Sequence, residues 1–233
     1  MWTVRPTHSE METFVGQRKY SSVVFDFGGV LITPITNRIA ELAVRHGVSM
    51  ETLLSVLMGP RERSTADHPW HRAERGEIPV ANFHVLVEPW AREVDLVLDG
   101  DEFEIILDGV FDVHGEIIER IRALRSEGYT TGLLTNSFRE FRVHLERRID
   151  ISVFDHVIDS SEVGCRKPEP EIYDLTTDRF GVAPDRILYL DDFLSNVEGA
   201  QAKGWGTIHV TSPAQTLIDL DRELERAPGA DLP

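Results

Sequence analysis

The stretch that decides the fold is Val23-Val24-Phe25-Asp26-Phe27-Gly28-Gly29-Val30-Leu31. A short β-branched and aromatic run, followed at once by Asp and two glycines, is typical of a buried strand that ends in a tight turn. Such a strand carries Asp26 to its C-terminal end, which in an open α/β sheet is where ligands bind. A carboxylate held there can act as a nucleophile or a metal ligand. The same pattern also fits an Asp that only opens a turn or caps a helix.

Composition and charge narrow the class of protein. The chain has 233 residues, of which 41% are hydrophobic, and this is enough to bury a sizeable core. Forty acidic residues against 24 basic ones give a formal net charge of -16, which would repel nucleic acid and anionic membranes. We therefore expect neither as a partner, although a small phosphorylated substrate needs only a local positive pocket.

Targeting signals are missing from the sequence as given. Residues 1–20 lack the apolar core of a signal peptide and are expected to form a polar N-terminal extension. No run of 18 apolar residues occurs either. The single cysteine, Cys165, excludes an internal disulfide and favours a reducing compartment. We therefore predict a cytoplasmic protein.

Residues 36–114 are predicted to be a helical insertion. Apolar residues recur at helical spacing in two stripes, which contain Ile39, Leu42, Ala43 and His46 in the first and Leu53, Leu54, Leu57 and Met58 in the second. Gly59-Pro60 breaks the second helix, and a charged segment with Trp70 and His71 follows. A further helical pattern covers residues 80–94, and no convincing strand occurs in this region.

From residue 116 onward, strands and helices alternate. Expected strands cover residues 129–134, 156–159, 187–190 and 206–210, and expected helices cover residues 116–128, 139–147, 168–180, 195–203 and 216–226. Alternation of this kind implies right-handed crossovers and a mostly parallel sheet that is covered on both faces. The predicted fold class is α/β, with a Rossmann-like core made of residues 21–35 and 115–233.

Three of the predicted strands end in chemically reactive or polar residues, namely Asp26, then Thr135 with Asn136, and then Asp191 with Asp192. Parallel strands place their C-terminal ends at one edge of the sheet, so these groups can converge although they are far apart in sequence. A loop with two prolines places Lys167 just before a helix. Taken singly, the same residues also fit a Thr-Asn turn, a solvated lysine and an Asp-Asp helix cap.

The order of these motifs carries a resemblance to a known family. The sequence contains Phe25-Asp26-Phe27-Gly28-Gly29-Val30, Leu134-Thr135-Asn136-Ser137, Arg166-Lys167-Pro168 and Leu190-Asp191-Asp192, in that order. From about residue 20 to residue 212 it thus resembles the haloacid dehalogenase-like (HAD) hydrolases. The helical insertion resembles the small cap of the subfamily that contains the phosphatase domain of bifunctional epoxide hydrolases. Arg75-Gly76-Glu77-Ile78 matches a turn that is common in such caps.

The resemblance implies a Mg²⁺-dependent phosphatase that acts on a small phosphorylated metabolite through an aspartyl-phosphate intermediate. Asp26 would be both nucleophile and metal ligand, joined as ligands by the backbone carbonyl of Gly28 and by Asp192. Such a site suits the hard oxygen ligands that Mg²⁺ prefers. Asp191 would orient a water molecule and pair with Lys167.

The resemblance also implies a phosphate site. Thr135 would offer its hydroxyl to the phosphoryl oxygens, with Gly28, Gly29 and Asn136 beside it. Lys167 would neutralise charge on both the nucleophile and the phosphoryl group, because a carboxylate must approach a dianionic phosphate.

Gly28 departs from the family pattern. In the family's phosphatases the residue two after the nucleophile is usually Asp, which protonates the leaving alcohol and then activates water. General acid-base catalysis contributes about 10²- to 10⁴-fold, so another group would have to substitute. Candidates are Thr33, His68 and His71, or the substrate could have a leaving group that needs no proton.

Two other functions stay open. Gly28 favours a non-catalytic descendant that binds a phosphorylated ligand or a protein. A dehalogenase acting through an Asp26 ester ranks last, because that branch usually carries Tyr at the Gly28 position and the pair Asp191 and Asp192 favours a metal. In any of these cases the cap would set specificity, with Trp70, His71 and Arg72 as candidate substrate contacts, unless they form a solvated face.

Overall fold

A five-stranded parallel sheet forms the core of the protein. The computed structural model describes residues 18–34, 36–59, 68–81, 83–100, 102 and 111–225, so the expected N-terminal extension lies almost entirely outside the described residues. The strands are β1 (Ser22–Phe25), β2 (Thr130–Thr135), β3 (His156–Asp159), β4 (Ile187–Asp191) and β5 (Gly206–His209), in the order β3-β2-β1-β4-β5. All four strand pairings are parallel, which confirms the predicted α/β class.

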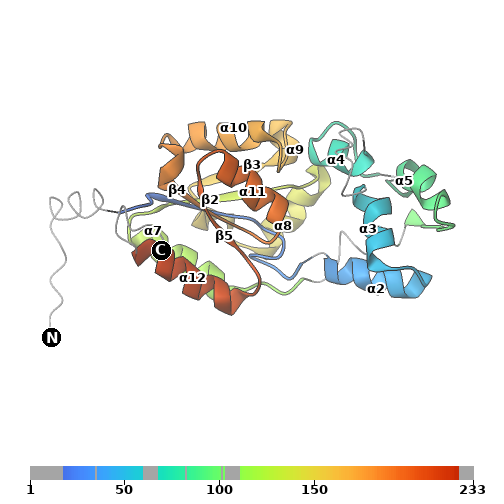
Figure 1. Cartoon of the computed structure of the whole chain (residues 1–233), viewed down its shortest axis with the longest axis horizontal. Coiled ribbons are helices and arrows are strands. Elements are labelled where there is room, and N and C mark those ends of the chain that lie inside the picture. Colours follow the sequence, from blue (N-terminus) through green and yellow to red (C-terminus); the bar gives the residue numbers. More distant parts are fainter. Residues whose placement is uncertain are drawn as a thin grey trace.

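Helices cover both faces of this sheet (Figure 1). Along β1, Val23 and Phe25 pack into one hydrophobic cluster and Val24 into another, as the alternation of side chains along a strand requires. The first cluster includes side chains of α7 (Gly115–Ser126), α8 (Arg142–Arg148) and α12 (Pro213–Glu225). The second includes side chains of α10 (Pro170–Phe180) and α11 (Leu194–Ala202).

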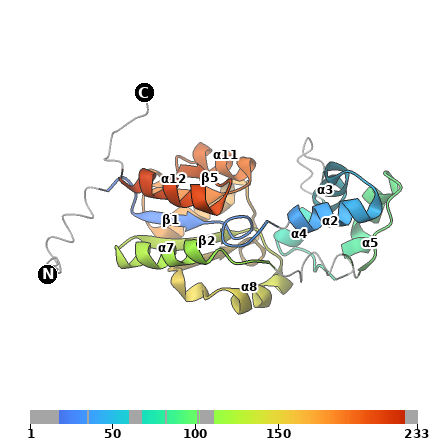
Figure 2. The ribbon, with the colours of Figure 1, turned by 90° about the horizontal axis from the view of Figure 1, so that it is seen from below.

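A separate group of helices lies beside this core (Figures 1 and 2). It consists of α2 (Thr36–His46), α3 (Met50–Met58), α4 (Pro69–Glu74) and α5 (Phe83–Arg92), which we call the helical lobe. The lobe has a hydrophobic cluster of its own, to which the sheet domain contributes Phe138. It corresponds to the described part of the helical insertion that was predicted over residues 36–114.

Two short helices were not predicted. Helix α4 has 6 residues and lies in the segment that was expected only to be charged, and α9 (Ser160–Val163) has 4 residues. Elements this short do not display a helical period, so the pattern gives no signal for them. Two 3₁₀ helices of 3 residues each, η2 (Ile151–Val153) and η3 (Pro184–Arg186), were not predicted either. Other differences are shifts of boundaries; for example, α12 begins at Pro213 rather than at residue 216. None of the helices in the described part of the chain has the length and apolar composition needed to cross a membrane.

Strand register aligns the ends of the central strands. Phe25 of β1 pairs with Leu133 of β2 and with Leu190 of β4, so the residues that follow them reach the same edge of the sheet. The chain builds the sheet outward from β1 to β3 and then returns to place β4 on the other side of β1. This reversal is a topological switch point, where open α/β sheets form their ligand sites.

Candidate active site

Three carboxylates meet at the switch point between β1 and β4. Asp26 directly follows β1, Asp191 ends β4, and Asp192 comes next. The backbone N–H of Asp26 donates to the carbonyl of Leu190 at 2.9 Å, which extends the ladder and keeps the two strand ends level. One carboxylate oxygen from each residue lies within 4.8 Å of the others. The expected convergence of the first and the last of the sequence motifs is therefore present in the structure.

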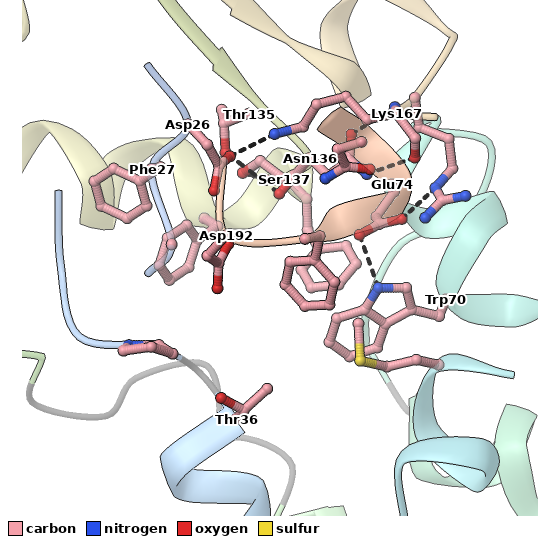
Figure 3. Close-up of a pocket in the computed structure, with 18 of the residues that line it drawn as sticks. Asp26, Phe27, Thr36, Trp70, Glu74, Thr135, Asn136, Ser137, Lys167 and Asp192 are labelled. Carbon is pink, nitrogen blue, oxygen red and sulfur yellow. Dashed lines mark hydrogen bonds and ion pairs between the residues drawn. The ribbon is translucent and has the colours of Figure 1, made fainter. Parts of the chain in front are cut away.

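Lys167 connects two of these carboxylates. Its Nζ donates to Asp26 Oδ1 at 2.5 Å (Figure 3). It also donates to Asp191 Oδ2 at 2.8 Å and to the carbonyl of Leu134 at 2.9 Å. The lysine side chain is buried, and an ammonium in such a place must use its donors on fixed acceptors. Burial opposes its charge, but Asp191 and Asp26 hold the pKa of Lys167 above its usual range.

Asp191 is saturated with hydrogen bonds. Besides Lys167, it accepts from the Tyr189 hydroxyl, from Asn196 Nδ2 at 3.0 and 3.1 Å, and from the backbone N–H of Phe193 at 2.7 Å. The residue has no exposed surface. A carboxylate with this many donors has no free lone pair for a metal, so Asp191 is suited to orienting Lys167 and the loop after β4.

Asp192 is arranged differently. Its Oδ1 is buried and has no hydrogen-bond partner among the described residues. Gly29, at φ +77°, lies directly against this side chain, and a Cβ built on Gly29 would be 2.2 Å from Asp192 Oδ2. The turn after Asp26 therefore passes close to the Asp192 carboxylate because Gly29 has no side chain.

The charges at the sheet edge do not balance. Three carboxylates face one ammonium, and this excess of negative charge contributes to raised pKa values of Asp26 and Asp192. Burial raises the pKa of Asp26 to about 8, with Lys167 opposing the shift and the other two carboxylates adding to it. Burial together with Asp191 raises the pKa of Asp192 to about 7. The site fits a divalent cation such as Mg²⁺ for three reasons. Its donors are hard oxygens, one buried oxygen of Asp192 has no partner among the described residues, and negative charge is in excess.

The predicted phosphate-site residues divide into two groups. Thr135 and Gly28 line the same pocket as Asp26, and the Thr135 hydroxyl has only a weak contact of 3.4 Å to the carbonyl of Asn136. The Asn136 side chain instead binds the backbone of Lys167, since its Oδ1 accepts from the N–H and its Nδ2 donates to the carbonyl, both at 2.9 Å. The Asn136 amide thus positions Lys167. Asn136 also lines the pocket, and its expected place beside the phosphate stays a prediction.

The lobe closes the other side of the pocket. Trp70 lines it, and its Nε1 donates to Glu74 Oε1 at 2.8 Å, while Glu74 Oε2 accepts from Arg166 Nε (Figure 3). Glu74 and Trp70 are four residues apart on α4, so they share one face of that helix. Arg166 directly precedes Lys167, and this ion pair links the lobe to the loop that carries the lysine.

Several residues that were expected to contact the substrate or to replace the missing acid do not line the pocket. Thr33 Oγ1 accepts from the backbone of Asp112, and His68 is buried as the N-cap of α4, with Nδ1 accepting from the Trp70 N–H. The described residues that line the pocket include none of Thr33, His68, His71 and Arg72. The proposed substitutes for an acid at Gly28 are therefore not supported by position, and of the three candidate substrate contacts only Trp70 lines the pocket.

Three residues that shape the site were missed by the sequence analysis. Glu74 lies in helix α4, which was not predicted. Tyr189 is on a strand that was expected only to be buried, and Asn196 is on α11. None of the three belongs to a sequence motif. A usable signal did exist for Glu74, because it directly precedes the Arg75-Gly76-Glu77-Ile78 turn that had been singled out.

Comparison with known proteins finds a matching family model and several relatives of similar sequence. The model of the haloacid dehalogenase-like hydrolases matches residues 20–204. Bifunctional epoxide hydrolase 2 of Rattus norvegicus is 26% identical over 222 residues, which cover 90% of this chain but 39% of that protein. A sesquiterpene phosphatase of Aspergillus oryzae is 26% identical over 209 residues, covering 86% of this chain and 95% of the other.

A solved structure is similar in fold. A HAD family enzyme of Bacteroides thetaiotaomicron, crystallised with magnesium and inorganic phosphate, superposes with a TM-score of 0.59 at 18% identity and covers 85% of this chain and 98% of the other. At this identity the likeness concerns the fold alone. The chain spans about two fifths of the epoxide hydrolase, so that protein's remaining length has no counterpart in the aligned region.

Proposed function

The chain belongs to the haloacid dehalogenase-like hydrolases, and from this premise we propose that it is a Mg²⁺-dependent phosphatase that forms an aspartyl phosphate on Asp26. The observation that carries the proposal is the contact of Lys167 Nζ with both Asp26 and Asp191 beside the unpartnered oxygen of Asp192. Phosphatases among the relatives support the same reaction class.

In the proposed reaction, the Asp26 carboxylate attacks phosphorus, the bond from phosphorus to the leaving oxygen breaks, and that oxygen takes its proton from solvent. Water then attacks the phosphorus of the aspartyl phosphate, which releases phosphate and restores Asp26. Lys167 holds the Asp26 carboxylate at the sheet edge and adds positive charge for the phosphoryl group. Thr135 Oγ1 offers a donor to a phosphoryl oxygen, and Asn136 keeps Lys167 in place through its backbone.

Magnesium would be held by Asp26, Asp192 and the backbone carbonyl of Gly28. When bound, it would favour the ionised form of Asp26 and neutralise charge on the phosphoryl group. Gly28 also favours a second candidate, a domain that binds a phosphorylated ligand without turning it over, because no carboxylate follows the nucleophile at that position.

The test is phosphate release from a panel of phosphate monoesters with Mg²⁺ and with EDTA. We expect release that needs Mg²⁺ and that falls at least about 10³-fold in Asp26→Asn, since this change removes the nucleophile. Asp174→Asn is the matched control, because Asp174 is exposed and pairs only with Lys203 among the described residues. Acid-quenched enzyme should carry phosphate that hydroxylamine removes, as an acyl phosphate does.

Two outcomes would contradict the proposal. Turnover that survives in Asp26→Asn would exclude the aspartyl-phosphate route. Tight binding of phosphate monoesters with no release by the wild-type protein would favour the non-catalytic domain, and halide release from haloacids without Mg²⁺ would favour a dehalogenase.

A further inference from the structure

The wall of the pocket opposite the carboxylates is apolar. Trp70 from the lobe and Phe138 from the sheet domain meet edge to face, with ring centroids 4.9 Å apart, and both are buried. Other apolar side chains that line the pocket are Ile32, Met58, Phe111 and Phe141. A wall of this kind favours a substrate body that is itself apolar, and aromatic rings pack well edge to face against it.

Three of the polar side chains that line the pocket, Glu74, Asn136 and Asn196, are engaged with other groups of the protein. Glu74 accepts from Trp70 and from Arg166, and both polar atoms of the Asn136 side chain bind the backbone of Lys167. The Asn196 Nδ2 donates to Asp191. A sugar phosphate buries several hydroxyls, and each one without a partner loses binding free energy. These engaged groups therefore give little support to a hydroxyl-rich body.

The space beside Gly28 is open. A Cβ built on Gly28 meets no heavy atom within 4 Å, and the residue does not have a positive φ, so the backbone there accepts a residue with a Cβ. No acid stands at this position to protonate a leaving oxygen. The other titratable groups among the described lining residues are Asp26, Glu74, Arg166, Lys167 and Asp192, and each is either in an ion pair or in the proposed metal and nucleophile site.

Both observations point to one class of substrate. We infer that the protein hydrolyses phosphate monoesters of phenol-type alcohols, whose aromatic body lies against Trp70 and Phe138. This inference rests on the proposed phosphatase function and specifies its substrate. Asp26 forms its bond to phosphorus while the bond to the aryl oxygen breaks, and the aryl oxygen leaves as a phenolate that takes its proton from solvent. A phenol has a pKa of about 10, like that of Tyr, so its anion can leave without an acid, whereas an alkoxide cannot.

Phenyl phosphate and cyclohexyl phosphate form the decisive pair of substrates, because their bodies are similar in size and apolarity but their leaving groups differ in acidity. With the Mg²⁺-loaded wild-type protein we expect kcat/KM to be at least about 100-fold higher for phenyl phosphate, the contribution of a missing general acid. Gly28→Asp should raise the turnover of cyclohexyl phosphate and narrow this ratio. Gly28→Ala fills the space without adding an acid and should leave the ratio unchanged.

A binding measurement tests the preference for an apolar substrate body separately from the rate of phosphate release. By calorimetry with Asp26→Asn, phenyl phosphate should bind at least about tenfold more tightly than glucose 6-phosphate, which has hydroxyls that the wall cannot satisfy. Equal turnover of phenyl and cyclohexyl phosphate, or tighter binding of the sugar phosphate, would overturn this inference and leave the phosphatase function standing. Absence of phosphate release from every monoester would instead remove the phosphatase function, and this inference with it.

Discussion

Two adjacent aspartates at the end of β4 have opposite surroundings. Asp191 accepts hydrogen bonds from four residues and is fully buried, whereas Asp192 has an oxygen with no partner among the described residues. Consecutive residues at a strand end point to opposite sides, so one carboxylate turns into the sheet domain and the other toward the pocket. This explains how the pair can supply one positioning residue and one candidate metal ligand.

Gly29 is expected to matter through Asp192. In Gly29→Ala, the new Cβ would have to share space with Asp192 Oδ2 at 2.2 Å, in addition to the strain of a positive φ. We predict that this variant weakens Mg²⁺ binding at least about tenfold, measured by calorimetry, and loses phosphatase activity in parallel.

Gly47→Ala is the matched control for Gly29→Ala. Gly47 also has a positive φ, +67°, but a Cβ there meets nothing within 4 Å. This variant should lose about 1 kcal/mol of unfolding free energy and bind Mg²⁺ normally. Normal Mg²⁺ affinity in Gly29→Ala as well as in Gly47→Ala would show that the contact between Gly29 and Asp192 does not matter for metal binding.

Helix α4 contributes both Trp70 and Glu74 to the pocket although it has only 6 residues. His68 caps its N-terminus through Nδ1, and Pro69 follows at a position where its missing N–H costs nothing. One helical turn then brings Trp70 and Glu74 to the same side, where Glu74 meets Arg166. The helix is therefore held at its start by the cap and near its end by the ion pair.

The buried cap predicts a pH-dependent stability. Burial, together with His71, lowers the pKa of His68 from 6.5 to about 4. As the pH falls below about 6.5 the unfolded chain binds a proton at His68 that the folded chain does not bind, so the folded state loses stability down to about pH 4. Between pH 7 and pH 5 this loss should be about 2 kcal/mol, measured by urea unfolding.

His68→Asn isolates this effect from other titrating groups. Asn is a good N-cap residue and does not titrate, so the difference in unfolding free energy between pH 7 and pH 5 should shrink by about the same 2 kcal/mol. An unchanged pH dependence in His68→Asn would mean that His68 is not the titrating group.

At the scale of the whole molecule, the lobe and the sheet domain meet at the loop that carries Lys167. Glu74 pairs with Arg166, and Arg75 pairs with Glu169 at 2.8 Å. Gly76 then passes so close to the carbonyl of Ser161 that a Cβ would be 2.2 Å from it. The orientation of the lobe and the position of Lys167 are thus set by the same few contacts.

The Glu74–Arg166 pair should be strongly coupled. Its side chains are only 6% and 14% exposed, so removal of one partner leaves a poorly solvated charge. We predict that Glu74→Gln and Arg166→Gln each lower the unfolding free energy by about 2 to 3 kcal/mol, and that the double variant loses at least about 1 kcal/mol less than their sum.

An exposed pair provides the comparison for this cycle. Arg92 and Glu88 form an ion pair on α5 with side chains 74% and 51% exposed. The corresponding cycle of Arg92→Gln and Glu88→Gln should give a coupling below about 0.5 kcal/mol. Similar couplings for the two pairs, from urea unfolding, would contradict a structural role for Glu74 and Arg166.

Local sequence was enough to predict the parallel sheet and the meeting of Asp26, Thr135 and Asp191 at one edge. Each of these residues follows or ends a short apolar run. Because the strands are parallel, their C-terminal ends lie at the same edge of the sheet. The identity of Lys167 as their partner came from the order of the motifs. The short helices α4 and α9 gave no pattern, and their positions depend on packing against distant residues.

The sequence by itself determined the strands, the longer helices, the fold class and the groups able to carry the chemistry, because these depend on side-chain period and on residue type at strand ends. Only the tertiary structure decided how those groups are used. It turned the Asn136 amide onto Lys167, saturated Asp191, left an oxygen of Asp192 open, and brought Glu74 to Arg166. The physical reason is that a hydrogen bond depends on side-chain direction and on neighbours up to 92 positions away, which no local pattern encodes.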